Sequence, residues 1–297
     1  MSTDDALGGA RRKDWPGTGT RLLGLVGHPI GHSLSPAMHN AALAAAGLDL
    51  AYVAVDVEAD SLPVVLGGLH AFGFVGVNVT VPHKQAVARA CATLTDEAAV
   101  VGAVNTVVVA ADGLHGHNTD TSGFLAGLPT DLAAGHAVVV GAGGAARAVV
   151  VALTRIGWAV TVVARRGDAA AALVAQFAGN GGAEPAAAEL ASSDLAGGPA
   201  AVAAADLVVN ATPLGLAGEP LPDAFMRLRP DQAAYDLVYN PARTPFLVAA
   251  EVAGARVIGG LEMLVNQAAA AFEIWTGVHP DRQAMAAAAR HALADRT

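Results

Sequence analysis

The sequence predicts an α/β protein with two lobes and a cleft between them. Short β-branched runs alternate with Ala- and Leu-rich stretches of helix length, a pattern typical of parallel sheets covered by helices on both faces. One such run leads directly into a glycine-rich turn, and a Gly- and polar-rich stretch before it indicates a boundary between lobes. With 297 residues, 54% of them apolar, the chain is long enough for about two domains.

The first lobe is expected to alternate strands with helices. Each strand is a largely β-branched apolar run, and Pro36 stands where helices favour proline, near their start. The expected strands are Leu22–Gly27, Ala51–Val57, Phe74–Thr80 and Val104–Ala110, and the expected helices are Pro36–Ala46, Asp60–Phe72 and Lys84–Ala92.

The second lobe repeats this alternation, and two strand-free helices follow it. Its strands are expected at Ala137–Val140, Ala159–Ala164, Leu207–Asn210, Ala234–Leu237 and Arg256–Ile258, with a helix over Gly143–Ile156. The final helices, Leu261–Thr276 and Asp281–Ala294, are expected to pack back on the first lobe. The predicted domains are residues 21–119 together with 261–297, and residues 120–260; residues 1–20 are predicted to be a disordered tail.

Composition excludes several classes of function. The net charge is −9, so the chain lacks the basic surface that binding to nucleic acid requires. The longest stretch without Asp, Glu, Lys or Arg, Ser61–His83, contains two prolines and four glycines, so no membrane-spanning helix is expected. No hydrophobic run follows the basic N-terminal residues, so no secretory signal is predicted. The single cysteine, Cys91, favours a reducing, cytoplasmic location.

A glycine-rich turn joins an apolar strand to a helix in the second lobe. Its sequence, Gly141-Ala-Gly-Gly-Ala-Ala146, fits the GxGxxA form in which glycines permit a tight turn and close approach of a pyrophosphate. The helix N-terminus then offers N–H groups to the phosphates. An ordinary strand–turn–helix is the alternative. A second strand about 20 residues later favours a Rossmann-type dinucleotide site at Gly141, Ala142, Gly143, Gly144 and Ala145.

The end of that second strand bears on the choice of cofactor. NAD sites usually place an acidic residue there, whereas this strand is followed by Arg165 and Arg166. Two guanidinium groups suit a 2′-phosphate, so NADP is the expected cofactor. The alternative is an exposed arginine pair at a helix entry, and Asp168 leaves NAD open.

Three short polar segments, called polar islands below, interrupt the apolar sequence of the first lobe. Ser33 and Ser35 would point the same way in an extended segment and could grip a carboxylate or polyol, although helix capping by Ser35 is the simpler alternative. Asn78 and Thr80 share one face of a strand. Lys84 begins the next helix, where the helix dipole disfavours the charged form of its amine. An amine that loses its proton more easily is suited to acid–base catalysis. The alternative is an ordinary surface lysine.

A third island contains Asn105 at a strand start and Asp120 before a helix, where capping is the ordinary role of an aspartate. All three islands lie at or beside strand–helix junctions. Because ligands of open α/β lobes collect beyond the carboxyl ends of the strands, these residues are expected to form one site.

The order of these motifs resembles the shikimate dehydrogenase family. The motifs are HSLSP, NVTVPHK, GAVNT, NTD and GAGGAAR, followed by Asn210-Ala-Thr-Pro213, Tyr235-Asp-Leu-Val-Tyr239 and Gly260-Leu-Glu-Met-Leu-Val-Asn-Gln267. The resemblance covers roughly residues 21–297. It implies a substrate-binding and catalytic lobe, an NADP-binding Rossmann lobe, and reversible NADPH-linked reduction of 3-dehydroshikimate to shikimate in aromatic amino-acid (chorismate) biosynthesis, without a metal. It also allows a homodimer.

The resemblance assigns roles to particular residues. Lys84 and Asp120 match the catalytic pair. The substrate-contacting positions are Ser33, Ser35, Thr80, Asn105, Tyr239 and Gln267, with Asn78 as their supporting partner. Besides the glycine turn, the cofactor-side positions are Asp96, Gly260, Thr212, Leu237 and Met263.

One motif departs from the family pattern. The family's 2′-phosphate motif reads Asn-Arg-Thr with a further Arg three residues later, whereas this chain has Ala164-Arg165-Arg166. An NAD-dependent quinate/shikimate dehydrogenase working in quinate catabolism is therefore the alternative function, and a catalytically silent ligand sensor is a second. A metallohydrolase, suggested by His28, His32, His39, His115 and His117, is disfavoured because no HExxH motif or Cys pair accompanies them.

Overall fold

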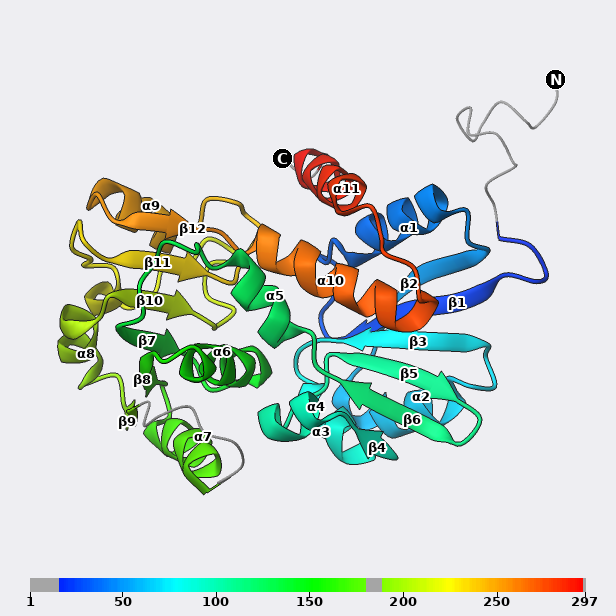
Figure 1. Ribbon diagram of the computed structural model, residues 1–297, viewed down its shortest axis with the longest axis horizontal. Coiled ribbons are helices and arrows are strands. Elements are labelled where there is room, and N and C mark those ends of the chain that lie inside the picture. The colour runs from blue at the N-terminus through cyan, green and yellow to red at the C-terminus, as the bar shows by residue number, and fades with distance from the viewer. Residues whose placement is uncertain (1–15, 180–188, 296–297) are drawn as a thin grey trace.

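The computed structural model describes residues 16–179 and 189–295. It contains two six-stranded sheets, which Figure 1 shows side by side with helices α5 and α10 between them. This arrangement confirms the predicted α/β fold with two lobes. Residues 1–15 of the predicted tail lie outside the described residues.

The first sheet is mixed, which corrects the expectation of wholly parallel sheets. β1 (Arg21–Gly27) pairs in parallel with β2 (Leu50–Asp56) and β3 (Phe74–Val79). β5 (Thr106–Ala110) pairs antiparallel with β3 and with β6 (Gly113–His117). β5 and β6 are joined by a two-residue turn, which only antiparallel neighbours can use. The short β4 (Thr93–Leu94) completes the order β2-β1-β3-β5-β6-β4.

The second sheet is wholly parallel and has the Rossmann strand order. Its order is β12-β11-β10-β7-β8-β9, so the first strand of the lobe, β7, lies at the centre and the chain winds outward in both directions. The strand bounds are β7 His136–Val140, β8 Ala159–Val163, β9 Leu190–Ser193, β10 Leu207–Asn210, β11 Ala233–Asp236 and β12 Arg256–Ile258.

Helices cover both sheets, and several begin or end away from the expected residues. The predicted helix Asp60–Phe72 is a 3-10 turn, Ala59–Ser61, followed by α2, which ends at the glycine pair Gly67-Gly68. The helices are α1 Ser35–Ala46, α2 Leu62–Gly68, α3 Lys84–Ala90, α4 Asp96–Val101, α5 Asp120–Gly127, α6 Gly144–Arg155, α7 Gly167–Gly179, α8 Gly198–Ala204, α9 Pro245–Val252, α10 Leu261–Thr276 and α11 Arg282–Ala294.

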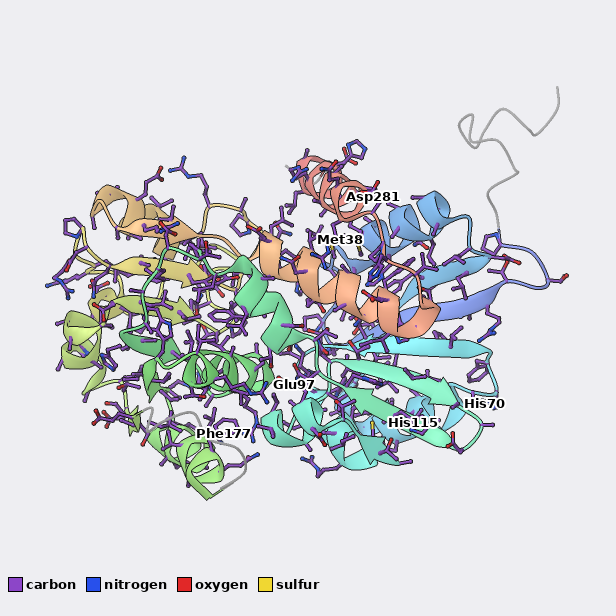
Figure 2. The ribbon with its side chains drawn as sticks, viewed as in Figure 1. Met38, His70, Glu97, His115, Phe177 and Asp281 are labelled. Atoms are coloured by element: carbon purple, nitrogen blue, oxygen red, sulfur yellow. The ribbon has the colours of Figure 1, made fainter. Side chains whose placement is uncertain are left out.

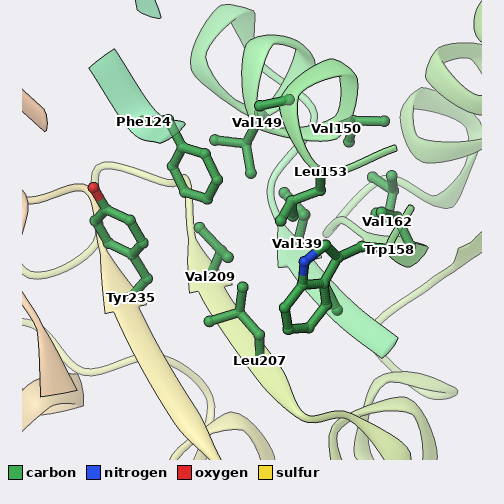
Figure 3. Close-up of a cluster of buried hydrophobic side chains, with 14 of the residues drawn as sticks. Phe124, Val139, Val149, Val150, Leu153, Trp158, Val162, Leu207, Val209 and Tyr235 are labelled. Carbon is green, nitrogen blue, oxygen red and sulfur yellow. The ribbon is translucent and has the colours of Figure 1, made fainter. Parts of the chain in front are cut away.

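Helix α10 contributes to the cores of both lobes. Ala268 and Phe272 pack into the first core with Met38 of α1, whereas Met263 packs into the second core. Figure 2 shows side chains filling both lobes, with Met38 labelled between α10 and α11. The second core also receives Phe124 of α5, which stacks on Tyr235 with ring centroids 4.8 Å apart (Figure 3). The helices α5 and α10 therefore join the lobes.

Within residues 16–179 and 189–295, no helix combines the length and apolar character needed to cross a bilayer.

The junction between the lobes contains a close contact that can be tested. A methyl group at Gly127 would lie 2.3 Å from the Tyr235 hydroxyl, which is buried and has no hydrogen-bond partner among the described residues. We expect Gly127→Ala to lower the free energy of unfolding by about 1–3 kcal/mol through overpacking. Tyr235→Phe should restore most of it, because the nearest ring carbon is 3.4 Å from the new methyl position.

Denaturant unfolding of both single variants and the double variant measures this coupling. Tyr235→Phe alone should change stability little, since no hydrogen bond is lost. A double variant as unstable as Gly127→Ala would show that the hydroxyl is not the obstacle.

Candidate active site

A pocket between the two lobes gathers the predicted site residues. It lies beyond the carboxyl ends of β1 and β3, and α10 forms one wall. All nine predicted catalytic and substrate-contacting residues line it, together with four of the predicted cofactor residues: Ser33, Ser35, Asn78, Thr80, Lys84, Asn105, Asp120, Tyr239 and Gln267, and Ala145, Leu237, Gly260 and Met263.

A buried ion pair lies in this pocket. Lys84 Nζ donates to Asp120 Oδ2 at 2.5 Å, and the two side chains are 13% and 6% exposed. Each residue is the first of its helix, α3 or α5. Asp120 does not act as the predicted helix cap; Thr119 holds the N-cap position, and the carboxylate turns to the lysine. The arrangement leaves an amine and a carboxylate facing the pocket, where a proton can be exchanged with a ligand.

Asn105 supports the carboxylate from the other side. Its Nδ2 donates to Asp120 Oδ1 at 2.8 Å and lies 3.3 Å from Gln267 Oε1, so side chains of α5 and α10 meet at one amide. Its Oδ1 accepts from the Thr119 backbone N–H at 2.8 Å. Both oxygens of Asp120 are thus hydrogen-bonded, as a buried charge requires.

Asn78 lies behind Asn105. Its Nδ2 donates to the Asn105 carbonyl oxygen and to Thr106 Oγ1, both at 3.1 Å, and its Oδ1 accepts from the Tyr52 hydroxyl at 2.8 Å. Thr106 and Tyr52 were not predicted from the sequence. Thr106 directly follows Asn105 in a motif that was identified, whereas Tyr52 lies in an apolar strand with no polar neighbour to mark it.

The two serines form a polar patch on the pocket wall. Ser33 Oγ lies 3.2 Å from both Ser35 Oγ and the Ser35 backbone N–H. The capping alternative for Ser35 is wrong, because α1 begins at Ser35 itself and its N-cap residue, Leu34, makes no side-chain cap. Both serines line the pocket, and a hydroxyl group can donate to a carboxylate.

The glycine turn fits a dinucleotide. β7 ends at Val140, and Gly141 has φ +121°, a conformation that L side chains rarely adopt. Gly143 is the N-cap residue of α6, and a Cβ there would meet nothing within 4 Å, so its face is open to a ligand. A Cβ on Gly144 would lie 3.0 Å from Lys84 Cδ. The glycine turn of one lobe therefore contacts the lysine of the other.

The loops that follow β10 and β11 are joined by hydrogen bonds beside this turn. Asn210 Oδ1 accepts from the Thr212 N–H and hydroxyl at 3.0 and 2.6 Å, and its Nδ2 donates to Asp236 at 2.9 Å. Asp236 also accepts from Thr244 Oγ1, and burial raises the pKa of its carboxyl to about 6. These bonds fix the loops that carry Thr212, Leu237 and Tyr239.

The other eight predicted cofactor residues do not line the pocket; five belong to the glycine turn and the loop of Thr212 described above, and three lie elsewhere. Arg165 and Arg166 are exposed just beyond the carboxyl end of β8, where a 2′-phosphate is expected in a Rossmann fold. Asp96 is the exposed first residue of α4, which packs against α6. Figure 2 shows Glu97, the next residue, at this junction, where it pairs with Arg155 of α6.

The histidines have separate roles. His28 contacts Asp56 at 2.8 Å, and His115 lies between Thr93 and Asp112. His39 is fully buried, and burial lowers its pKa to about 3. In the part of the chain that the structure describes, no three His, Cys, Asp or Glu side chains are grouped to hold a metal ion.

Gly143 gives a direct test of the dinucleotide turn. Gly143→Ala should leave the melting temperature unchanged, because φ is −83° and the added methyl meets no protein atom within 4 Å. It should weaken NADP binding at least about tenfold, because the methyl occupies the face where the pyrophosphate is expected. Calorimetric titration measures the affinity, with Gly31→Ala, also in open space, as the control. Unchanged affinity would place the phosphates elsewhere.

Comparisons with known proteins agree with this geometry. The family model described as "Shikimate dehydrogenase substrate binding domain" matches residues 25–107, and "Shikimate 5'-dehydrogenase C-terminal domain" matches residues 260–290. A shikimate dehydrogenase (NADP(+)) from Moorella thermoacetica is 48% identical, over 87% of this chain and 88% of its own length.

Solved structures are similar over nearly the whole chain. The Thermus thermophilus shikimate 5-dehydrogenase in complex with NADP(H) and shikimate has a TM-score of 0.78 and 39% identity, over 92% of this chain and all of its own (100%). A Corynebacterium glutamicum quinate dehydrogenase in complex with NAD has a TM-score of 0.80 and 36% identity, over 91% and 98%. With this fold, this pocket and these relatives, the chain belongs to the shikimate dehydrogenase family.

Proposed function

We propose that this protein is an NADP-dependent shikimate dehydrogenase, which interconverts 3-dehydroshikimate and shikimate in the biosynthesis of aromatic amino acids. The observation that carries the proposal is the buried Lys84–Asp120 pair, which faces a pocket of hydroxyl and amide groups and contacts the dinucleotide turn. Curated relatives with NADP-dependent shikimate dehydrogenase activity in their names, 43–48% identical over most of this chain, support it.

The pocket offers complementary groups for each part of the substrate. The Ser33 and Ser35 hydroxyls would hold the carboxylate, with Tyr239 beside them. Asn105, Asp120, Lys84 and Gln267 would surround the ring hydroxyls, because their donors and acceptors meet within one hydrogen-bonded cluster. Thr80 lines the same wall. In this orientation the charged group of the substrate would bind away from the carboxylate of Asp120.

The ion pair supplies the proton chemistry. Bound NADP(H) supplies or accepts a hydride at ring C3. Lys84 would move the proton on the oxygen of that carbon, and Asp120 would orient the amine or share the proton. Because Asn105 fixes the other oxygen of Asp120, the carboxylate is held ready before the substrate arrives.

The second lobe would hold the cofactor. The turn Gly141–Ala145 would take the pyrophosphate at the N-terminus of α6, and Arg165 with Arg166 would take the 2′-phosphate. Thr212, Leu237, Gly260 and Met263 would lie beside the nicotinamide, and Asp96 would lie on the cofactor side of α4.

A homodimer and a cytoplasmic location stay predictions. Size-exclusion chromatography with light scattering measures the molar mass in solution and so tests for the homodimer.

The role of Lys84 is tested by Lys84→Ala. We expect kcat for shikimate oxidation to fall by about 10²–10⁴, the usual loss of an acid–base group, with little change in KM. Arg89→Ala removes a positive charge from the exposed side of the same helix and serves as the control. An unchanged kcat in Lys84→Ala would remove the lysine from the chemistry.

Cofactor and substrate choice are tested together by steady-state rates with shikimate and quinate against NADP and NAD. Shikimate with NADP should give the highest kcat/KM, whereas quinate with NAD would indicate the catabolic alternative.

Arg165→Ala should raise KM for NADPH at least about tenfold and leave KM for NADH nearly unchanged, because only NADPH carries the 2′-phosphate. Arg290→Ala, an exposed arginine on α11 of the other lobe, controls for net charge. Equal effects on the two cofactors would contradict phosphate recognition by Arg165.

A further inference from the structure

A buried tyrosine lies behind the substrate pocket without lining it. Tyr52 is 2% exposed and belongs to β2, the edge strand of the first sheet. Its side chain reaches across β1, because its hydroxyl donates to Asn78 of β3 at 2.8 Å. Two strands of the sheet are thus linked through a side chain that the pocket does not contact.

Asn78 connects Tyr52 to the ion pair through further hydrogen bonds. Its Nδ2 donates to the Asn105 carbonyl and to Thr106, whose hydroxyl in turn donates to Asn105 Oδ1 at 3.1 Å. Asn105 then donates to Asp120. An unbroken series of hydrogen bonds therefore runs from the Tyr52 hydroxyl to the carboxylate that holds Lys84.

The orientation of the Asn78 amide is fixed by these partners. If the amide rotated by half a turn, its oxygen would face the carbonyl oxygen of Asn105, and two acceptors would meet in a buried place. In the observed orientation the amide oxygen points away from Asn105 and needs a donor, which Tyr52 supplies. Without that donor a buried acceptor loses its hydrogen bond, a costly arrangement that favours reorientation.

Tyr52 is itself held rigidly. Its backbone N–H and C=O both bond to the Asn40 side chain at 2.9 Å. Its ring stacks on that of His39, with centroids 4.3 Å apart and planes 6° apart. Burial raises the pKa of Tyr52 well above its usual value, so the hydroxyl keeps its proton and remains a donor. The neutral His39 ring acts here as packing.

We propose that Tyr52 is a positioning residue of the substrate pocket, which acts through Asn78 to hold Asn105 and the Lys84–Asp120 pair in their working geometry. The inference rests on the proposed function, since its readout is shikimate oxidation. It adds a residue that does not line the pocket.

The test compares two buried tyrosines. Tyr52→Phe should lower kcat/KM for shikimate about tenfold, the size expected for one lost buried hydrogen bond, while KM for NADP changes less than about twofold. Tyr235→Phe is the matched control: Tyr235 is 0% exposed, and its hydroxyl has no partner within the described ranges. It should leave both parameters within about twofold of wild type. Rates are normalised to the folded fraction from thermal unfolding.

A double-mutant cycle separates positioning from general loss of structure. In an Asn78→Ala background, Tyr52→Phe should cause no further loss in kcat/KM, because the proposed route passes through Asn78. Losses that multiply would overturn the proposal, as would Tyr52→Phe behaving like Tyr235→Phe. Wild-type protein without activity toward shikimate would overturn the proposed function, and this inference with it. Active wild type with an unaffected Tyr52→Phe would overturn only the inference.

Discussion

The buried contact between Lys84 and Asp120 is the constraint on which the site depends. An amine and a carboxylate with little solvent exposure stabilise each other only if their remaining hydrogen-bonding capacity is also satisfied. Asn105 meets that need for one carboxylate oxygen, and the Asp120 backbone N–H bonds to Asn118 at 3.0 Å. The first turns of α3 and α5 must therefore stay beside the start of β5, so the folding of the first lobe fixes the positions of Lys84 and Asp120.

The same lysine also ties the two lobes together. Gly144, the first residue of α6, packs so closely on the Lys84 side chain that a Cβ there would lie 3.0 Å from Lys84 Cδ. The glycine turn of the second lobe and the Lys84–Asp120 pair of the first lobe are thus in direct contact. Helices α5 and α10, which contribute to the junction between the cores, carry Asp120 and Gln267 into the pocket.

The sequence predicted those strands and site residues that a local pattern, such as a β-branched run or a short motif, identifies. The β-branched runs predicted β7 and β10, and all nine residues that the motifs predicted to be catalytic or substrate-contacting line one pocket. It did not predict β6, whose sequence GLHGH has no β-branched residue and forms a strand because β5 pairs with it. Tyr52 was missed for a related reason: its role comes from reaching across β1 to Asn78, a contact that no spacing along the chain reveals.

The central claim is that Lys84 and Asp120 meet over the carbon that exchanges its hydrogen, and a crystal structure of the complex with NADP and shikimate tests it most directly. The account predicts the oxygen on ring C3 within about 3 Å of Lys84 Nζ or of an Asp120 carboxylate oxygen, and the substrate carboxylate on Ser33 and Ser35. A bound substrate whose C3 oxygen contacts neither side chain would contradict it.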